Sequence, residues 1–161
     1  MEAAKLMFTI RNRRGEEVNF FHFHSLSLVT IGVLVIWIVL YHHSDPDKHA
    51  GSFYGNAIAD WSGSVVIIIA TKYLFEKGSA DSRKPRKIKH HPVLNFLRCH
   101  SLTIFLIITG SIWLAAYLRM DPTSKWGQVV GNIVSEWVQM LGLVLLTKRL
   151  IERGSKESNP R

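Results

Sequence analysis

The chain has 161 residues, a formal net charge of +8 and one cysteine. A single cysteine excludes an intrachain disulfide framework, and a hydrophobic content of 47% excludes a disordered chain. A mean hydropathy of +0.11 beside so high a charge indicates that apolar and charged residues occupy separate blocks, which is typical of an integral membrane protein. The length of the apolar blocks also excludes a basic nucleic-acid-binding module.

Four apolar runs are each about long enough to cross a bilayer as a helix. Roughly 20 residues at a rise of 1.5 Å cover a hydrocarbon core of about 30 Å. The runs are continuous in Ile, Val and Leu rather than alternating, so helices are expected rather than the strands of a barrel. The predicted spans cover 26–41, 55–74, 102–117 and 129–150. The sequence therefore predicts an all-α membrane protein with four transmembrane helices.

Basic residues are distributed unequally between the segments that connect these spans. Only Lys48, Arg119 and Lys125 fall after the first and third spans, so the other 17 of the 20 Lys and Arg residues lie in the termini, in the middle segment or at the span ends that adjoin them. The positive-inside rule places both termini and the middle segment in the cytoplasm. We therefore expect residues 43–53 and 119–127 to face outward.

Several aromatic residues fall toward the outer ends of the predicted spans. Tryptophan and tyrosine are enriched at membrane–water interfaces, where they form aromatic belts. The residues expected in such a belt include Trp37, Tyr41, Trp113, Tyr117 and Trp137.

The chain contains an internal repeat. A shift of 76 residues aligns 19–82 with 95–158 without a gap, and 22 of the 64 aligned positions are then identical. Each unit contains two predicted spans, an even number, so both units enter the bilayer from the same side and the repeat is parallel. The prediction is a cytoplasmic segment, a two-helix unit, a basic linker that attracts anionic lipids, a second two-helix unit and a tail: 1–18, 19–82, 83–94, 95–158 and 159–161.

The second unit contains two recognisable motifs, N-x-x-S-E-W-x-Q from Asn132 and T-K-R-L-I-E-R-G-S-K-E-S from Thr147. Together with the apolar run between them, they resemble a family of small bacterial integral membrane proteins of unknown function. The first unit departs from that pattern at Ala59, Asp60 and Gly63. The resemblance implies four spans in a bacterial inner membrane, and it carries no activity.

A repeated motif, G-x3-G-N-x3-[D/E]-W, places an asparagine and an acid in the second and fourth spans. The acid follows the asparagine by four residues, so the two side chains share one helix face. A carboxylate that faces lipid is costly, so we expect it to face the interior or a wet cavity, where rings of acidic side chains attract cations. The predicted ion path is lined by Asn56, Asp60, Ser64, Asn132, Glu136 and Gln139.

Other interpretations of the candidate residues stay open. Asp60 and Glu136 lie near the predicted starts of their helices, where they could instead complement the helix dipole. His24 and His100, at the cytoplasmic starts of the first and third spans, could sense pH or ligate a haem as a pair. Haem is the one cofactor that we consider, and otherwise we expect none. The sequence contains no Cys-x-x-Cys or His-x3-His spacing that would indicate a metal site.

The predicted function is a small ion channel or transporter that is selective for cations, with Asp60 and Glu136 near the outer end of the path. The alternative is a non-catalytic accessory or scaffold subunit, and a bis-histidine haem protein is the third possibility. The lone Cys99 and the serines lie in no nucleophile-elbow or triad context, so we expect no enzyme activity. Two hairpins enclose little interior, which favours a homo-oligomer and, among these, a dimer.

Overall fold

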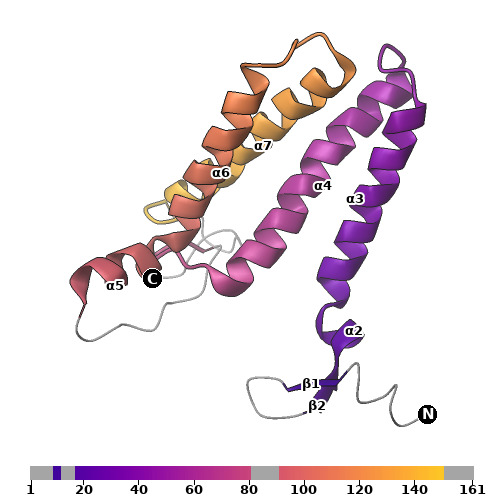
Figure 1. The fold of residues 1–161 in the computed structure, drawn as a ribbon. Coiled ribbons are helices and arrows are strands. Elements are labelled where there is room, and N and C mark those ends of the chain that lie inside the picture. Colours follow the sequence, from indigo (N-terminus) through magenta and orange to yellow (C-terminus); the bar gives the residue numbers. More distant parts are fainter. Residues whose placement is uncertain (1–8, 12–16, 81–90, 151–161) are drawn as a thin grey trace.

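The computed structural model describes residues 9–11, 17–80 and 91–150. Most of these residues are helical (Figure 1). The elements are β1 (Thr9–Arg11), β2 (Glu17–Asn19), α2 (Phe20–Phe23), α3 (Ser25–His43), α4 (His49–Tyr73), α5 (Pro92–Cys99), α6 (Ser101–Tyr117) and α7 (Lys125–Leu146). The two strands form a short antiparallel ribbon in which Ile10 pairs with Val18. The predicted tail and most of the predicted linker lie outside the described residues, and α5 begins inside that linker at Pro92.

Three helices, α3, α4 and α7, are long and apolar enough to cross a membrane. Helix α6 has 17 residues, and together with α5 it forms a pair that is bent by 65° and is also apolar enough. The described residues thus contain three candidate spans, or four if the bent pair counts as one. The predicted helical class is confirmed, apart from the small strand ribbon, and the lengths and apolar composition of these helices are compatible with membrane insertion. The four spans and the internal repeat stay predictions.

The four long helices form a row rather than a closed bundle. Helix α3 packs against α4, α4 packs against α7, and α7 packs against α6 (Figure 1). The short connections 44–48 and 118–124 lie at one end of the row, which we call the loop end. The segment 74–80, α2 and α5 lie at the other end, which we call the linker end. The central pair, α4 and α7, therefore runs in the same direction.

The flanking helices present apolar side chains to the surroundings. On α3, Leu26 and Val29 are each 62% exposed, and on α6, Ile112 is 63% exposed. A soluble monomer rarely exposes apolar patches on this scale, whereas the hydrocarbon of a bilayer solvates them.

Helices α4 and α7 begin earlier than the apolar runs that predict them. Helix α7 begins at Lys125 because the Ser124 hydroxyl accepts a hydrogen bond from the Gly127 amide at 3.1 Å, which caps its first turn. The connecting loop also folds back onto this turn, so that a Cβ atom at Gly127 would overlap the carbonyl oxygen of Asp121. A Cβ atom at Gly51 would overlap the carbonyl oxygen of Asp45 in the same way.

The buried core lies along the seams between neighbouring helices. It includes Tyr41, Ile58, Ala59, Leu102, Leu106, Ile133, Trp137 and Val144. The Trp137 indole donates a hydrogen bond to the Thr109 hydroxyl at 2.8 Å, and the Tyr41 hydroxyl donates to the carbonyl oxygen of Lys125 at 2.6 Å. Tyr41 and Trp137, which the sequence predicts in an interfacial belt, are therefore buried side chains that join one helix to another.

Candidate functional site

The site lies between the two central helices, α4 and α7. Asn56 and Asp60 lie one turn apart on α4, and Asn132 and Glu136 lie one turn apart on α7. The amide nitrogen Nδ2 of Asn132 donates a hydrogen bond to Oδ1 of Asn56, and the two atoms are 2.5 Å apart. The shared helix face that the sequence predicts within each repeat is thus brought against the same face of the other.

A cavity of about 140 Å³ opens beside the asparagine pair. Its lining residues are Asn56, Ala59, Asp60, Asn132, Ser135 and Glu136. Five of these six side chains carry oxygen, which is the ligand atom that hard cations prefer. The arrangement can therefore attract a cation and replace part of its hydration shell.

The cavity has one carboxyl group from each of the two helices. Asp60 on α4 and Glu136 on α7 both line it. Across from them, the absence of a side chain at Gly63 leaves room for Glu136, because a Cβ atom there would be 3.2 Å from Oε2 of Glu136. The two carboxyl groups can thus act together on a cation that enters the cavity.

The two acids lie near the middle of their helices. Asp60 follows His49, the first residue of α4, by 11 residues, and Glu136 follows Lys125, the first residue of α7, by the same number. At a rise of 1.5 Å per residue, this is about 16 Å from each helix start. The effect of the helix dipole falls off within the first turn. The expectation that the acids lie near the helix N-termini is therefore wrong, because both helices begin upstream of the apolar runs.

The structure brings together four of the six predicted ion-path residues, and it adds one polar residue. Ser64 and Gln139 do not line the cavity, and both are exposed further along α4 and α7. Ser135 does line it. Its position three residues after Asn132, which puts both on one helix face, is the signal that could have identified it.

A second polar cluster lies at the linker end and is centred on Glu76, whose side chain is fully buried. Its carboxylate forms an ion pair with Lys148 and accepts hydrogen bonds from Nδ1 of His100 at 2.6 Å and from the Thr103 amide at 3.3 Å. Burial raises the pKa of Glu76, but the hydrogen bonds from Lys148, Thr103 and His100 outweigh it and hold the pKa below its ordinary value of 4.5. The cluster joins the end of α4 to the start of α6 and the end of α7.

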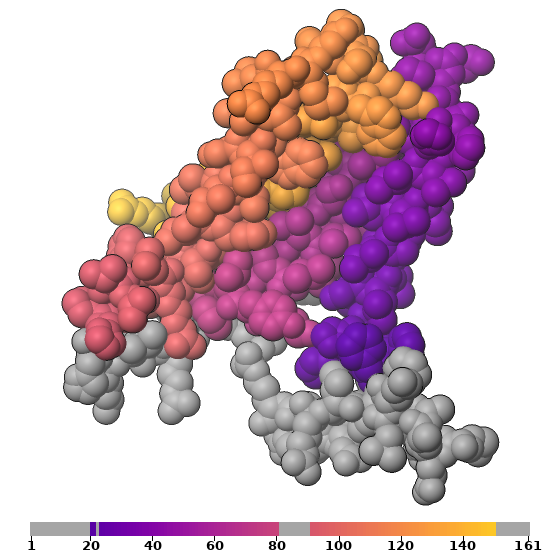
Figure 2. Space-filling model, in the orientation of Figure 1, coloured from indigo at the N-terminus to yellow at the C-terminus, as the bar shows by residue number. Residues whose placement is uncertain are grey.

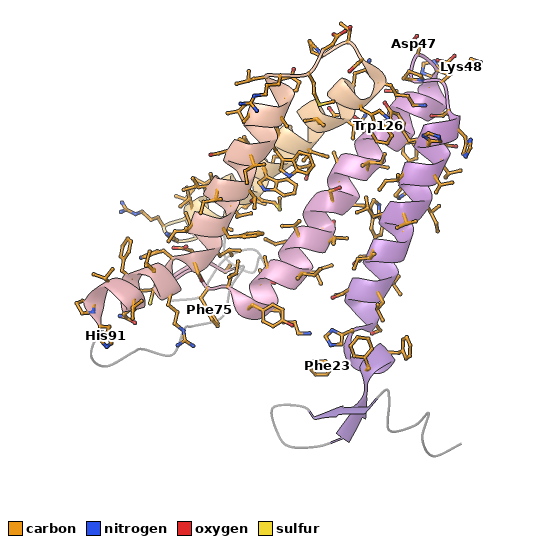
Figure 3. The ribbon with its side chains drawn as sticks, in the orientation of Figure 1. Phe23, Asp47, Lys48, Phe75, His91 and Trp126 are labelled. Atoms are coloured by element: carbon orange, nitrogen blue, oxygen red, sulfur yellow. The ribbon has the colours of Figure 1, made fainter. Side chains whose placement is uncertain are left out.

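The two candidate histidines contact different partners. His100 is paired with Glu76, whereas Nδ1 of His24 lies 3.1 Å from Nζ of Lys72 on α4. The same lysine lies over the ring of Phe23, 4.8 Å from its centroid (Figure 3 labels Phe23). Each histidine therefore takes part in a contact of its own at the linker end, and the contacts found among the described residues do not join the two at one site.

Sequence reasoning did not identify the central residues of the linker-end cluster, Glu76 and Lys148. The available signal was an acid surrounded by basic residues at the end of a span, in a position that the repeat retains as Glu152. Among residues 9–11, 17–80 and 91–150, no group of three or more His, Cys, Asp or Glu side chains could hold a metal ion.

Comparison of the chain with models of protein families, with curated proteins and with solved structures finds no match. Any statement about function therefore depends on the geometry of the chain itself.

Proposed function

We propose that this protein is a small integral membrane channel or transporter for cations, in which the polar face between α4 and α7 lines the path. The observation that carries the proposal is the cavity in which Asp60, Glu136 and the asparagine pair meet near the middle of two apolar helices. An acid at that depth in lipid costs several kcal/mol or more unless it serves a wet or paired site, so such acids are functional candidates by default.

In the proposed topology, α3, α4, α6 and α7 cross the bacterial inner membrane as two tandem hairpins, with both termini in the cytoplasm. Matching contacts in the two halves support a parallel repeat. A Cβ atom at Gly55 would lie 3.1 Å from Cε2 of Tyr41, and one at Gly131 would lie 3.0 Å from Cε2 of Tyr117. The excess of Lys and Arg at the linker end supports the orientation.

A second copy of the chain is proposed to cover the open side of the path. Asn56, Asp60, Ser64, Ser135 and Gln139 are all exposed on the surface of the single chain. Lipid hydrocarbon offers these groups no further hydrogen-bond partners, whereas the same face of a second chain would offer them. A two-fold dimer would place four carboxyl groups around one axis, which is a stronger field for cations than one pair.

The same exposed face also supports a second candidate function. A non-catalytic accessory or scaffold subunit would use the polar side chains of α4 and α7 to bind another membrane protein, because hydrogen bonds between helices hold such complexes together. The two candidates differ in whether the isolated protein moves ions.

The test is ion flux into liposomes that contain only this protein. Potassium and sodium are each supplied as a gradient, and uptake is followed with an entrapped fluorescent indicator. The proposal expects flux in the wild type, a lower rate or altered selectivity in Asp60→Asn and in Glu136→Gln, and a larger effect in the double variant, because each carboxyl is a large share of the local field.

The matched control is Asp47→Asn, which removes an exposed acid at the loop end that does not line the cavity (Figure 3 labels Asp47). Its flux should equal that of the wild type at the same protein density. If the wild type moves neither ion, nor protons with a pH-sensitive dye, the accessory role replaces the proposal. Flux that is unchanged in the double variant would show that the path lies elsewhere.

A further inference from the structure

Helix α5 has an apolar face that no other described part of the chain covers. Val93 is 68% exposed, Leu94 52%, Phe96 61% and Leu97 46%. On a helical projection these four positions fall on one side, and Asn95 and Cys99 fall on the other. Cys99 is buried, and its thiol lies 3.8 Å from Oδ1 of Asn95. The polar side of α5 therefore faces the protein, and the apolar side faces away from it.

The attachment of α5 holds it at a steep angle to α6. The amide of Lys77 donates to the carbonyl oxygen of Cys99 at 2.8 Å, and the guanidinium of Arg98 lies over the ring of Phe75 at 5.8 Å. These contacts hold the C-terminal end of α5, and the helix makes an angle of 65° with α6. Figure 3 places Phe75 near this attached end and His91 at the opposite, projecting end.

The position of α5 is that of a helix lying on a membrane surface. Because α6 is a span in the proposed topology, a bend of 65° at its start leaves α5 closer to the plane of the membrane than to its normal. The space-filling view shows α5 projecting sideways at the linker end instead of continuing the row (Figure 2). Its apolar face then lies at the depth where head groups meet acyl chains.

The charge of the sequence that leads into α5 indicates which lipid the helix contacts. The sequence from Ser82 to Cys99 contains six Lys and Arg residues and no Asp or Glu. Arg98 lies beside the apolar face and stays exposed while its guanidinium packs over the ring of Phe75, so its positive charge lies at the attached end of α5. An apolar helix face that directly follows a basic stretch of sequence is typical of a helix that inserts into an anionic membrane surface.

We propose that α5 is an interfacial helix that inserts Val93, Leu94, Phe96 and Leu97 into the anionic leaflet at the linker end. The inference depends on the proposed topology only for α6 as a span. It goes beyond attraction of lipids by the basic linker, because it assigns a defined apolar contact and an orientation to α5. Anchored in this way, α5 fixes the position of the linker-end cluster of Glu76 relative to the membrane surface.

The test uses spin labels on the full chain in vesicles, with Cys99 replaced by alanine. Single cysteines are introduced as Leu94→Cys and Leu97→Cys on α5, and accessibility to oxygen is compared with accessibility to a water-soluble nickel chelate. In vesicles of phosphatidylcholine with phosphatidylglycerol, both labels should favour oxygen several-fold over a label from Lys77→Cys, an exposed linker-end residue. Phosphatidylcholine alone should lower this preference at both α5 positions.

A label from Ile112→Cys on α6 distinguishes the possible failures, because it reports the span itself. If it favours oxygen while both α5 labels are as accessible to nickel as the label at position 77, α5 stands in water and the inference is overturned. If the Ile112→Cys label is also open to nickel, the proposed topology fails instead. If the α5 labels exclude both reagents and broaden one another's spectra, a second copy covers α5 and the lipid assignment is wrong.

Discussion

At the residue scale, two glycines allow the hairpins to close tightly. Gly55 on α4 and Gly131 on α7 lie against the rings of Tyr41 and Tyr117, the last aromatic residues of the preceding helices. A Cβ atom added at Gly55 would lie 3.1 Å from the ring of Tyr41, and one added at Gly131 would lie 3.0 Å from the ring of Tyr117. Both distances are about the shortest that non-bonded carbon atoms adopt. Small residues at such positions let helices approach closely in a membrane, where packing replaces the hydrophobic driving force.

We therefore expect Gly131→Leu to destabilise the protein by about 1–3 kcal/mol, because the ring of Tyr117 must move to admit the side chain. Thermal unfolding in detergent measures the effect as a lower Tm. Gly142→Leu is the matched control on the same helix, since no atom lies within 4 Å of its added Cβ. Equal Tm values for the two variants would contradict the packing role.

The buried carboxylate of Glu76 makes the stability of the fold depend on pH. Among the residues that the structure describes, its partners include Lys148, His100 and the backbone amide of Thr103. Because its folded-state pKa lies below the ordinary value of 4.5, these contacts contribute stability above that pH, and the contribution is lost as the pH falls through the folded-state pKa.

The Tm of the wild type is thus expected to fall as the pH is lowered from about 7 to below 4.5, because Glu76 takes up a proton. Glu76→Gln should lose on the order of 3 kcal/mol near neutral pH, since it removes the carboxylate from the ion pair with Lys148. It should also show a smaller further loss on acidification. The loop-end variant Asp47→Asn should keep the wild-type pH dependence, and a pH profile unchanged by Glu76→Gln would refute the assignment.

At the scale of elements, the break between α5 and α6 has a specific cause. The Leu102 amide bonds to the carbonyl oxygen of Phe75 at 3.0 Å, and the Phe75 amide bonds to the Ser101 hydroxyl at 2.9 Å. Hydrogen-bonding groups that would pair within one continuous helix are thereby paired with the segment that follows α4. An interruption of the helical ladder by another segment is a recognised cause of sharp bends.

The contact between α4 and α7 depends on a different kind of bond, between side chains. A double-mutant cycle of Asn56→Ala and Asn132→Ala should give a coupling energy of about 1 kcal/mol, as hydrogen bonds between helices in membranes do. Unfolding titrations in detergent measure the cycle. A second cycle with Asn56→Ala and Gln139→Ala should be additive, because Gln139 does not line the cavity. If both cycles were additive, the hydrogen bond between the two asparagines would not stabilise the contact between α4 and α7.

At the scale of the whole molecule, the row of four helices separates two kinds of surface. The flanking helices carry apolar side chains suited to lipid, such as Val29 and Ile112, whereas the central pair also exposes a polar stripe that includes Asp60 and Ser135. A closed four-helix bundle would have buried the polar stripe inside one chain. In the row the polar stripe is exposed, and we therefore propose that a second chain covers it.

Cross-linking in membranes tests this arrangement. In a chain with Cys99 replaced by alanine, Ser135→Cys should form a disulfide-linked dimer on mild oxidation, because residue 135 lies on the exposed polar face of α7. Val29→Cys, equally placed on an exposed surface but on the apolar side of α3, should stay monomeric. Cross-linking of the α3 variant in place of the α7 variant would move the interface to the flank of the row.

The sequence by itself determined the helical membrane class, the bounds of α3 and α6 to within two residues, and the shared faces of Asn56 with Asp60 and of Asn132 with Glu136. These features are local. A span needs a minimum length of apolar residues, and residues four apart on a helix share a face whatever the rest of the chain does.

Only the tertiary structure decided that the helices form a row, that Tyr41 and Trp137 are buried, and that Glu76 receives Lys148 and His100. It also decided that α5 turns away from α6. These outcomes depend on contacts between residues 24 or more positions apart, such as Glu76 with His100 and Trp137 with Thr109. The surface of a helix that is apolar on every side is solvated almost equally well by hydrocarbon and by another apolar helix. Its sequence therefore indicates little about which helix will pack against it.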